Sequence, residues 1–283
     1  MLTLTPTHVR AEAMVTQKDY WDSETYAAAA SFASHFADTL VERIEFKPTD
    51  RVLDIGCGDG IFTSRFAPRV GYVLGVDSSP SMIESAKKMD YGSTSTEFHV
   101  VDCRYLNKDP KIMNGNWDKV ASNAAFHWIL RDKITRISTL KAIFKSMKPG
   151  GVFFFEMCGH GNAAEKMTAF MFALVNQGVP IEKVEAACPW FYPSDAYMKE
   201  ALESVGFEIK TIGLKSEAHP VASAGMEGFM RLIGAQMLDL LDTEEQKDKV
   251  IEQIVRMTRY GTTREDGTQW ISYTGLRCIA VKP

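Results

Sequence analysis

A glycine-rich turn between an apolar strand and a helix is the feature of this sequence that most narrows its fold. Residues 52–60 read Val-Leu-Asp-Ile-Gly-Cys-Gly-Asp-Gly. The apolar run predicts a buried strand, and Gly56 and Gly58 let the backbone turn tightly and approach a ligand closely. A helix is expected next, over 60–67. Because many strand–helix turns carry glycines, a purely structural turn is the alternative at this stage.

Strands and helices alternate around this turn. Strand-like runs are expected at 51–56, 72–77, 96–101, 117–123, 152–157, 207–214 and 268–283, and helices at 23–46, 79–89, 133–147 and 194–206. The last run alternates like an edge strand. This order predicts an α/β fold with a Rossmann-like, doubly wound sheet of seven strands.

Two helical insertions are expected, at about 158–193 and 218–262. Each follows a strand predicted to run parallel to the first, so each leaves from the carboxyl edge of the sheet, where open α/β sheets bind ligands. We therefore expect them to form a lid. Within the second, Thr243 and the two glutamates after it resemble a helix N-cap and an acidic first turn. Residues 1–20 are polar and aperiodic and predict a flexible N-terminal arm, which leaves 21–283 as one domain.

Polar residues stand at the ends of neighbouring strands. Asp77 ends the second strand, at the usual distance for a carboxylate that accepts hydrogen bonds from ribose hydroxyls. Asp102 follows the third strand and is suited to accept from an exocyclic amine, and Asn123 ends the fourth. Together with the glycine turn, these strand ends predict a nucleoside-shaped cleft.

These motifs resemble those of the class I S-adenosylmethionine-dependent methyltransferases. The matching stretches are VLDIGCGDG (52–60), GVD (75–77), VVD (100–102), NAAFHW (123–128) and KPGGVFFFE (148–156). Trp21-Asp22 with Tyr26, Phe126-His127-Trp128 and the helices before the last strand are most similar to the trans-aconitate methyltransferase group. That group includes juvenile hormone acid methyltransferases and many fungal small-molecule enzymes.

The resemblance implies a cofactor site for S-adenosylmethionine, whose product is S-adenosylhomocysteine. The implied residues are Trp21, Tyr26, Asp54, Gly56, Cys57, Gly58, Asp77, Ser78, Asp102, Cys103, Asn123 and Ala124. Gly56 and Gly58 would pass under the methionine part, with Asp54 near its ammonium group. Asn123 and Ala124 would meet the same end through their carbonyl groups.

The other implied roles concern the nucleoside. Asp77 would hold the ribose hydroxyls, with Ser78 beside it against the adenine. Asp102 would accept from the adenine amine, and the Cys103 backbone would donate to the ring. Cys57 occupies a variable position of the pattern and is expected to be inert.

Aromatic residues are expected to enclose the reaction. Trp21 and Tyr26 would close over the cofactor. Trp128, after the fourth strand, and Trp190, in the first insertion, are predicted to contact the substrate. Apolar and aromatic residues elsewhere in the insertions favour a hydrophobic or aromatic acceptor over a small tricarboxylate.

Two histidines are candidate catalytic residues. His127 follows a strand end that should face the methyl group, so it is the first candidate for a general base; packing between Phe126 and Trp128 is the equal alternative. His160 lies between two glycines beyond the fifth strand and faces either the acceptor or solvent. A base is optional, because a carboxylate acceptor is already ionised at neutral pH.

The sequence thus predicts a small-molecule methyltransferase, O-directed, that works by aligning the reactants. N- or C-methylation, or another use of the same cofactor, is the alternative within the family. An NAD-type oxidoreductase and a non-catalytic cofactor-binding regulator are the alternatives outside it. The glycine spacing and Asp102 count against an NAD site. The resemblance to fungal small-molecule enzymes suggests secondary metabolism, but the sequence does not identify the acceptor.

Composition indicates which partners and which cellular compartment to expect for the protein. A net charge of −4 argues against a nucleic-acid partner. The 5 cysteines are scattered without a CxxC pair, so they indicate a reducing compartment and no metal site. No signal peptide or membrane-length apolar run is recognisable. We expect a cytoplasmic monomer or homodimer that does not bind membranes.

Overall fold

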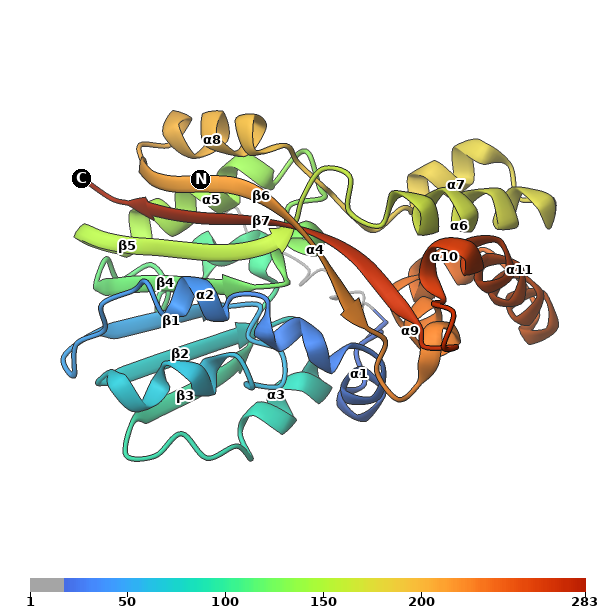
Figure 1. Cartoon of the computed structure of the whole chain (residues 1–283). Coiled ribbons are helices and arrows are strands. Elements are labelled where there is room, and N and C mark those ends of the chain that lie inside the picture. The colour runs from blue at the N-terminus through green and yellow to red at the C-terminus, as the bar shows by residue number, and fades with distance from the viewer. Residues whose placement is uncertain (1–17) are drawn as a thin grey trace, which may run out of the picture.

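One seven-stranded sheet organises the chain, with strand order β3-β2-β1-β4-β5-β7-β6 (Figure 1). The computed structural model describes residues 18–283, so most of the predicted N-terminal arm, residues 1–17, lies outside the described residues. Since β1 has β2 on one side and β4 on the other, the strand order changes direction there, and this is where such sheets bind ligands. The predicted Rossmann-like α/β fold is confirmed.

The strands follow the predicted runs in order, but the fifth begins earlier than predicted, at residue 147, and the sixth continues to residue 220, into the start of the second predicted insertion. They are β1 (Arg51–Ile55), β2 (Tyr72–Asp77), β3 (Ser95–Val100), β4 (Trp117–Asn123), β5 (Met147–Cys158), β6 (Glu208–Pro220) and β7 (Trp270–Val281). The first five pair in parallel, and β7 is antiparallel to both β5 and β6. Strand β6 is therefore parallel to β1, as predicted.

The prediction that the last strand is an edge strand is wrong. Strand β7 lies between β5 and β6, and its second half is buried. The alternation that suggested an edge covers residues 270–274, where β7 has run past β5 and pairs with β6 alone. The exposed β6 forms the edge.

Helices cover both faces of the sheet (Figure 1). One face packs against α4 (Phe126–Ile129), α5 (Arg136–Ser146) and α8 (Asp195–Ser204), through a core that includes Trp117, Phe153 and Phe155. The other face packs against α2 (Asp38–Val41) and α3 (Pro80–Ala86), through a core that includes Phe66 and Phe154. Because helices pack on both faces, the carboxyl ends of the strands are held in place relative to one another.

Two predicted helices are broken. The helix expected over 60–67 is replaced by two 3₁₀ turns, η2 (Thr63–Arg65) and η3 (Ala67–Arg69), where Pro68 has no amide hydrogen to continue an α-helix. The helix expected over 23–46 consists of α1 (Ser23–Ala30), η1 (Ser31–His35) and α2.

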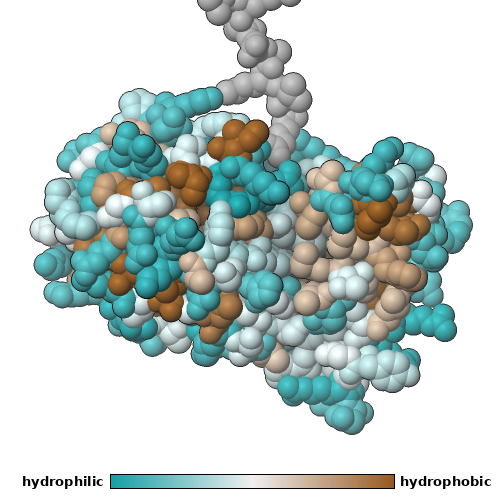
Figure 2. Space-filling model, turned by 90° about the horizontal axis from the view of Figure 1, so that it is seen from above, coloured by the Kyte–Doolittle hydropathy of each residue, from teal (hydrophilic) through white to brown (hydrophobic). Residues whose placement is uncertain are grey.

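The two predicted insertions form one helical lobe beyond the carboxyl edge (Figure 1). Its helices are α6 (Ala164–Asn176), α7 (Ile181–Ala187), α9 (Gly225–Ile233), α10 (Ala235–Leu238) and α11 (Glu244–Thr262). They share a buried apolar cluster with α1. The predicted cap at Thr243 is confirmed, because its hydroxyl accepts from the Gln246 amide in a capping box. On the face shown in Figure 2, surface apolar residues form separate patches among hydrophilic ones.

Candidate active site

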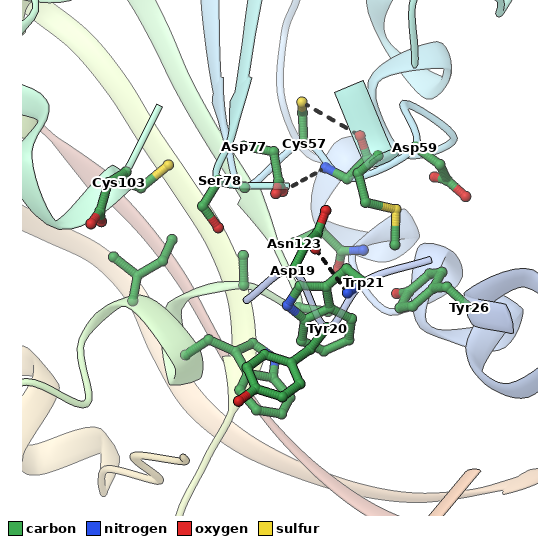
Figure 3. Close-up of a pocket in the computed structure, with 18 of the residues that line it drawn as sticks. Asp19, Tyr20, Trp21, Tyr26, Cys57, Asp59, Asp77, Ser78, Cys103 and Asn123 are labelled. Atoms are coloured by element: carbon green, nitrogen blue, oxygen red, sulfur yellow. Dashed lines mark hydrogen bonds between the residues drawn. The ribbon is translucent and has the colours of Figure 1, made fainter. Parts of the chain in front are cut away.

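A cavity lies at the carboxyl ends of β1, β2, β3 and β4, beneath the segment that leads into α1 (Figure 3). Every predicted cofactor residue except Asp54 lines it. The strand ends contribute Gly56, Cys57, Gly58, Asp59, Asp77, Ser78, Asp102, Cys103, Arg104, Asn123, Ala124 and Ala125. A cavity is therefore present at the strand ends where the sequence predicts a cleft.

The glycine turn forms the floor of the cavity. Gly56 and Gly58 have φ values of 69° and 56°, in the left-handed region that other residues rarely adopt. A Cβ on Gly56 would lie 2.3 Å from the Cβ of Ala125, whereas a Cβ on Gly58 would meet no atom within 4 Å. Close packing therefore requires the first glycine, and the space above the second is open to a ligand.

Asp77 is held in place by backbone amides. One carboxylate oxygen accepts from the Gly58 amide at 3.0 Å, and the other accepts from the Ser79 amide at 2.9 Å. Burial raises the pKa of Asp77, although these hydrogen bonds oppose the effect. Each oxygen keeps further lone pairs that can accept hydrogen bonds from a ligand.

Asp102 has a strong partner of its own. Its carboxylate accepts from Nε and Nη2 of Arg104, at 2.9 and 2.6 Å, and from the Arg104 amide. Burial alone would raise the pKa of Asp102, but these bonds lower it below its usual value. A donor that enters the cavity would therefore share this carboxylate with a guanidinium group. The adjacent Cys103 is buried and lines the cavity.

Asp54 and Asn123 carry buried oxygens without a partner. Asp54 is 0% exposed, and one of its oxygens accepts from Thr63 Oγ1 at 2.6 Å. Burial raises its pKa to about 7. Asn123 donates to the Ala33 carbonyl at 2.9 Å. Within residues 18–283, Oδ1 of Asp54 and Oδ1 of Asn123 have no hydrogen-bond partner, but of the two residues only Asn123 lines the cavity and can accept from a donor that enters it.

Ala124 adopts a strained backbone at the end of β4. Its φ is 52°, which is rare for a residue with a side chain. Its amide donates to the Glu156 carbonyl at 3.0 Å, which holds the turn against β5. This turn places the main chain of residues 123–125 on the cavity wall.

Aromatic rings continue from the cavity towards the helical lobe. The Trp21 ring centroid lies 6.1 Å from that of Tyr26 and 4.9 Å from that of Trp128. Trp128 contacts Trp190 at 6.0 Å, and Trp190 stacks on Tyr192 at 6.2 Å. Of the two predicted substrate residues, Trp128 lines the cavity and Trp190 extends the same aromatic row outside it.

The two candidate histidines do not line the cavity. His127 is 5% exposed, its Nδ1 accepts from the Cys158 amide at 3.3 Å, and its ring packs against Trp128 and Tyr192. Burial lowers the pKa of His127 to about 3, so the ring is neutral at physiological pH. This environment favours the packing alternative. His160 is exposed, in the turn after β5.

Sequence reasoning missed several cavity residues. They are Lys18, Asp19, Tyr20, Ser34, Asp59, Phe62, Met82, Arg104, Ala125, Ile129, Arg131 and Gln236. Residues 18–20 belong to the predicted flexible arm, but in the structure they form hydrogen bonds on both sides of the site. Asp19 accepts from Ser79 Oγ at 2.8 Å, and Tyr20 donates to Asp239 at 2.8 Å. No sequence signal marks these contacts, because the partners lie far away along the chain.

The described part of the chain contains no group of three or more histidine, cysteine, aspartate or glutamate residues arranged to hold a metal ion. Between residues 18 and 283, no helix has both the length and the apolar character of a membrane span.

Comparison with known proteins agrees with this geometry. Residues 52–151 match the methyltransferase-domain family. An uncharacterized methyltransferase of Schizosaccharomyces pombe is 28% identical over 274 residues, which cover 94% of this chain and 99% of the relative. Together with the fold, these matches support a class I S-adenosylmethionine-dependent methyltransferase. A trans-aconitate 2-methyltransferase of Deinococcus radiodurans is 27% identical over 217 residues, covering 74% of this methyltransferase and 78% of the relative.

A solved structure shares the fold. The protein BH2331 of Bacillus halodurans superposes with a TM-score of 0.57 and 16% identity, covering 87% of this methyltransferase and 98% of its own chain. The antiparallel β7 between β5 and β6 also separates this sheet from the parallel sheets of dinucleotide-binding domains.

The cavity of this methyltransferase fits the groups that its cofactor carries. An ammonium group needs an acceptor, and Oδ1 of Asn123 is a buried acceptor on the cavity wall without a partner among the described residues. A ribose diol needs a fixed acceptor, which Asp77 provides. The methionine chain needs a floor without side chains, which Gly58 provides.

Proposed function

We propose that this methyltransferase transfers a methyl group to an oxygen atom of a small hydrophobic or aromatic acceptor, and that the acceptor is a carboxylate. The observation that carries the proposal is the row of rings that leads from the cofactor cavity into the helical lobe, formed by Trp21, Trp128, Trp190 and Tyr192. A flat apolar molecule would bury its surface against these rings.

We assign the cofactor contacts as the resemblance implies. Gly56 and Gly58 lie under the methionine part, and Asn123 accepts from its ammonium group. Asp77 accepts from the ribose hydroxyls. The buried acceptors and the open floor described above support these assignments.

The adenine would lie against Ser78 and Cys103, with Asp102 accepting from its amine. Trp21 and Tyr26 would close the cavity over the cofactor. All five residues line the cavity, which supports this placement.

The bound cofactor supplies an electrophilic methyl group on a sulfonium ion. The residues of this chain then have to align the acceptor with that group and exclude water, and alignment alone can lower a barrier by about 7–11 kcal/mol. No histidine from the described residues lines the cavity. An acceptor that is already ionised needs no base, so a carboxylate can react here without the proton transfer that a hydroxyl needs.

Arg131 supports an anionic acceptor. Its side chain lines the cavity and donates to the neutral amide oxygen of Gln236 at 2.8 Å. An arginine that is bonded to an amide keeps donors and a positive charge for a carboxylate. Arg131 therefore attracts an anion to the same side of the molecule as the aromatic row.

The setting follows from the same reasoning. We propose that the protein acts in the cytoplasm, in secondary metabolism, on a small molecule and without nucleic acid, a membrane or a metal ion. The net charge of −4 and the aromatic side chains among those that line the cavity support a small-molecule acceptor. We propose that it is a monomer or a homodimer, two states that sedimentation analysis distinguishes.

Methyl transfer from a cofactor with a radioactive methyl group tests the proposal. The acceptor panel comprises aromatic and medium-chain monocarboxylic acids, a phenol, an aromatic amine and a tricarboxylic acid. We expect labelled products from the monocarboxylic acids that release labelled methanol in mild base, as methyl esters do. Label found only in base-stable products, or a preference for the tricarboxylic acid, would contradict the proposal.

A further inference from the structure

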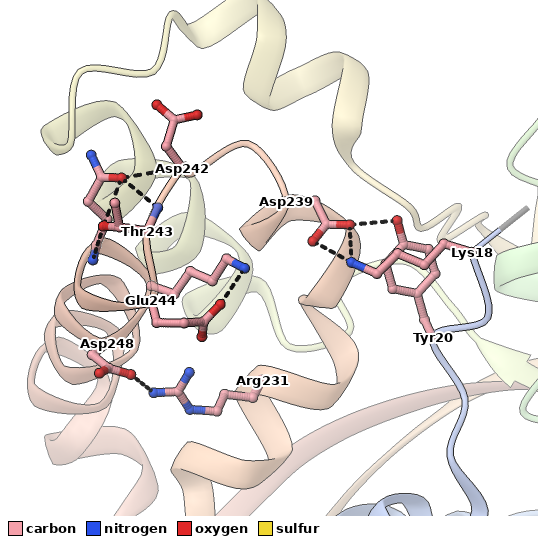
Figure 4. Close-up of polar contacts among 10 residues, drawn as sticks. Lys18, Tyr20, Arg231, Asp239, Asp242, Thr243, Glu244 and Asp248 are labelled. Atoms are coloured by element: carbon pink, nitrogen blue, oxygen red, sulfur yellow. Dashed lines mark hydrogen bonds and ion pairs between the residues drawn. The ribbon is translucent and has the colours of Figure 1, made fainter.

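Residues Lys18 to Trp21 form a strap across the cofactor cavity. All four line the cavity, and they run from its rim into α1 (Figures 3 and 4). They have no helical or strand structure of their own, so the strap depends on its side-chain contacts for its position.

One set of contacts ties the strap to the sheet. Asp19 accepts from Ser79 Oγ at 2.8 Å, and the Trp21 carbonyl accepts from the same hydroxyl at 3.1 Å. Ser79 is also the N-cap of α3 and donates its amide to Asp77, the residue assigned to the ribose. Asp19 and Trp21 are thus held beside Asp77.

The other set ties the strap to the helical lobe through one residue, Asp239. Lys18 Nζ donates to its two carboxylate oxygens at 2.8 and 2.7 Å, and the Tyr20 hydroxyl donates at 2.8 Å (Figure 4). Burial raises the pKa of Asp239, but the bonds from Lys18 and Tyr20 outweigh it and lower the pKa below its ordinary value. Lys18 and Tyr20 therefore bind the charged carboxylate of Asp239 in the helical lobe.

The helix that carries Asp239 contacts the cavity a second time. Asp239 is the C-terminal cap of α10, and Gln236, within α10, lines the cavity and accepts from Arg131. Helix α10 therefore touches both the strap and the wall of the cavity.

We propose that Asp239 is a positioning residue for cofactor binding: it holds Lys18 and Tyr20, and so keeps the strap closed over the cofactor. The inference rests on the assignment of the cavity to S-adenosylmethionine. A ligand beneath the strap leaves only when these contacts open, so Asp239 slows ligand dissociation. Because coupling between two sites is reciprocal, a bound cofactor also holds the lobe against the sheet.

The expected effect is moderate. The side chains of Lys18 and Asp239 are 62% and 32% exposed, and an ion pair this exposed contributes little. The hydrogen bond from Tyr20 to a charged carboxylate contributes more. Removing the carboxylate should weaken ligand binding about five- to tenfold.

The test uses the full chain with S-adenosylhomocysteine as the probe. Affinity is measured by calorimetry, the dissociation rate by stopped-flow tryptophan fluorescence, and stability by thermal unfolding. Asp239→Ala is compared with Asp248→Ala, a matched control that removes the carboxylate which pairs with Arg231 inside the same lobe (Figure 4). We expect Asp239→Ala to bind about five- to tenfold more weakly, through faster dissociation, and Asp248→Ala to bind like wild type.

Two further variants keep the test decisive. If Asp239→Ala unfolds, Tyr20→Phe removes one contact of the same carboxylate and should weaken binding on its own. In a soluble Asp239→Ala background, Tyr20→Phe should add almost nothing, because the bond is already lost. Wild-type affinity and dissociation rate in both Asp239→Ala and Tyr20→Phe, or equal losses in Asp239→Ala and Asp248→Ala, would overturn the inference. Failure of the wild-type protein to bind the probe would instead contradict the assignment of the cavity.

Discussion

The two glycines of the first turn allow packing to be separated from ligand contact. Both have a positive φ, so alanine at either position strains the backbone by about 1–2 kcal/mol. Only at Gly56 would the new Cβ collide with the protein, at 2.3 Å from Ala125 Cβ. At Gly58 the Cβ would extend into open space, where we place the cofactor.

These geometries predict different responses: a larger loss of stability at Gly56, and a loss of ligand affinity at Gly58. Gly56→Ala should lose about 2–5 kcal/mol of the free energy of unfolding, from strain plus overpacking. Gly58→Ala should lose only the strain, about 1–2 kcal/mol. Its new methyl group contacts the bound ligand, so it should bind S-adenosylhomocysteine about 10- to 100-fold more weakly, which corresponds to roughly 1–3 kcal/mol.

Thermal unfolding and calorimetric titration measure the two responses on the same preparations. Each kcal/mol should shift the unfolding midpoint by roughly 2–4 °C in a chain of this size. The larger loss of stability should appear in Gly56→Ala, and a selective loss of affinity in a folded Gly58→Ala. A Gly58→Ala protein that binds the probe as wild type does would refute our placement of the methionine part.

Three further outcomes follow from the structure. Burial raises the pKa of Glu156 to about 8 from 4.5, so wild-type stability should fall as the pH rises between these values, by up to about 1.4 kcal/mol per pH unit. Glu156→Gln should reduce the fall in stability that urea unfolding measures between pH 5.5 and 8, and leave the part due to Asp54, whose pKa burial raises to about 7; a fall as large as in the wild type would contradict the assignment. His127→Ala should lower the unfolding midpoint but leave the pH dependence of activity between pH 6 and 9 unchanged. If the variant instead lost the acidic or the basic limb of the pH–activity profile, His127 would be a general base after all. Trp190→Ala should raise the KM for an aromatic acceptor about tenfold without changing probe affinity, and equal effects on both would argue against a substrate contact.

Local chemistry explains why much of this fold could be predicted from the sequence. Open parallel sheets bind ligands at the carboxyl ends of their strands. A glycine turn or a carboxylate at such an end therefore indicates a ligand site from the local sequence alone. Gly56, Gly58, Asp77 and Asn123 accordingly line the cavity that the sequence predicts. The alternation of strands and helices likewise predicted the sheet.

The failures concern tertiary contacts. The role of Asp19 depends on Ser79, and that of Tyr20 on Asp239, 219 positions away, so no pattern near residue 20 reveals them. Asp54 fits the motif, but it lies inside a strand and its side chain turns to Thr63 rather than into the cavity. Whether a side chain at the end of a strand is exposed to a ligand depends on what packs against it.

The most direct test of the account is calorimetric titration of the wild-type chain and Asp77→Ala with S-adenosylhomocysteine and with NAD. We predict that the wild-type protein binds the homocysteine nucleoside and not NAD. Asp77→Ala should lose that binding, because the ribose acceptor held by Gly58 and Ser79 is gone. Binding of NAD without binding of S-adenosylhomocysteine, or unchanged affinity in Asp77→Ala, would contradict the account.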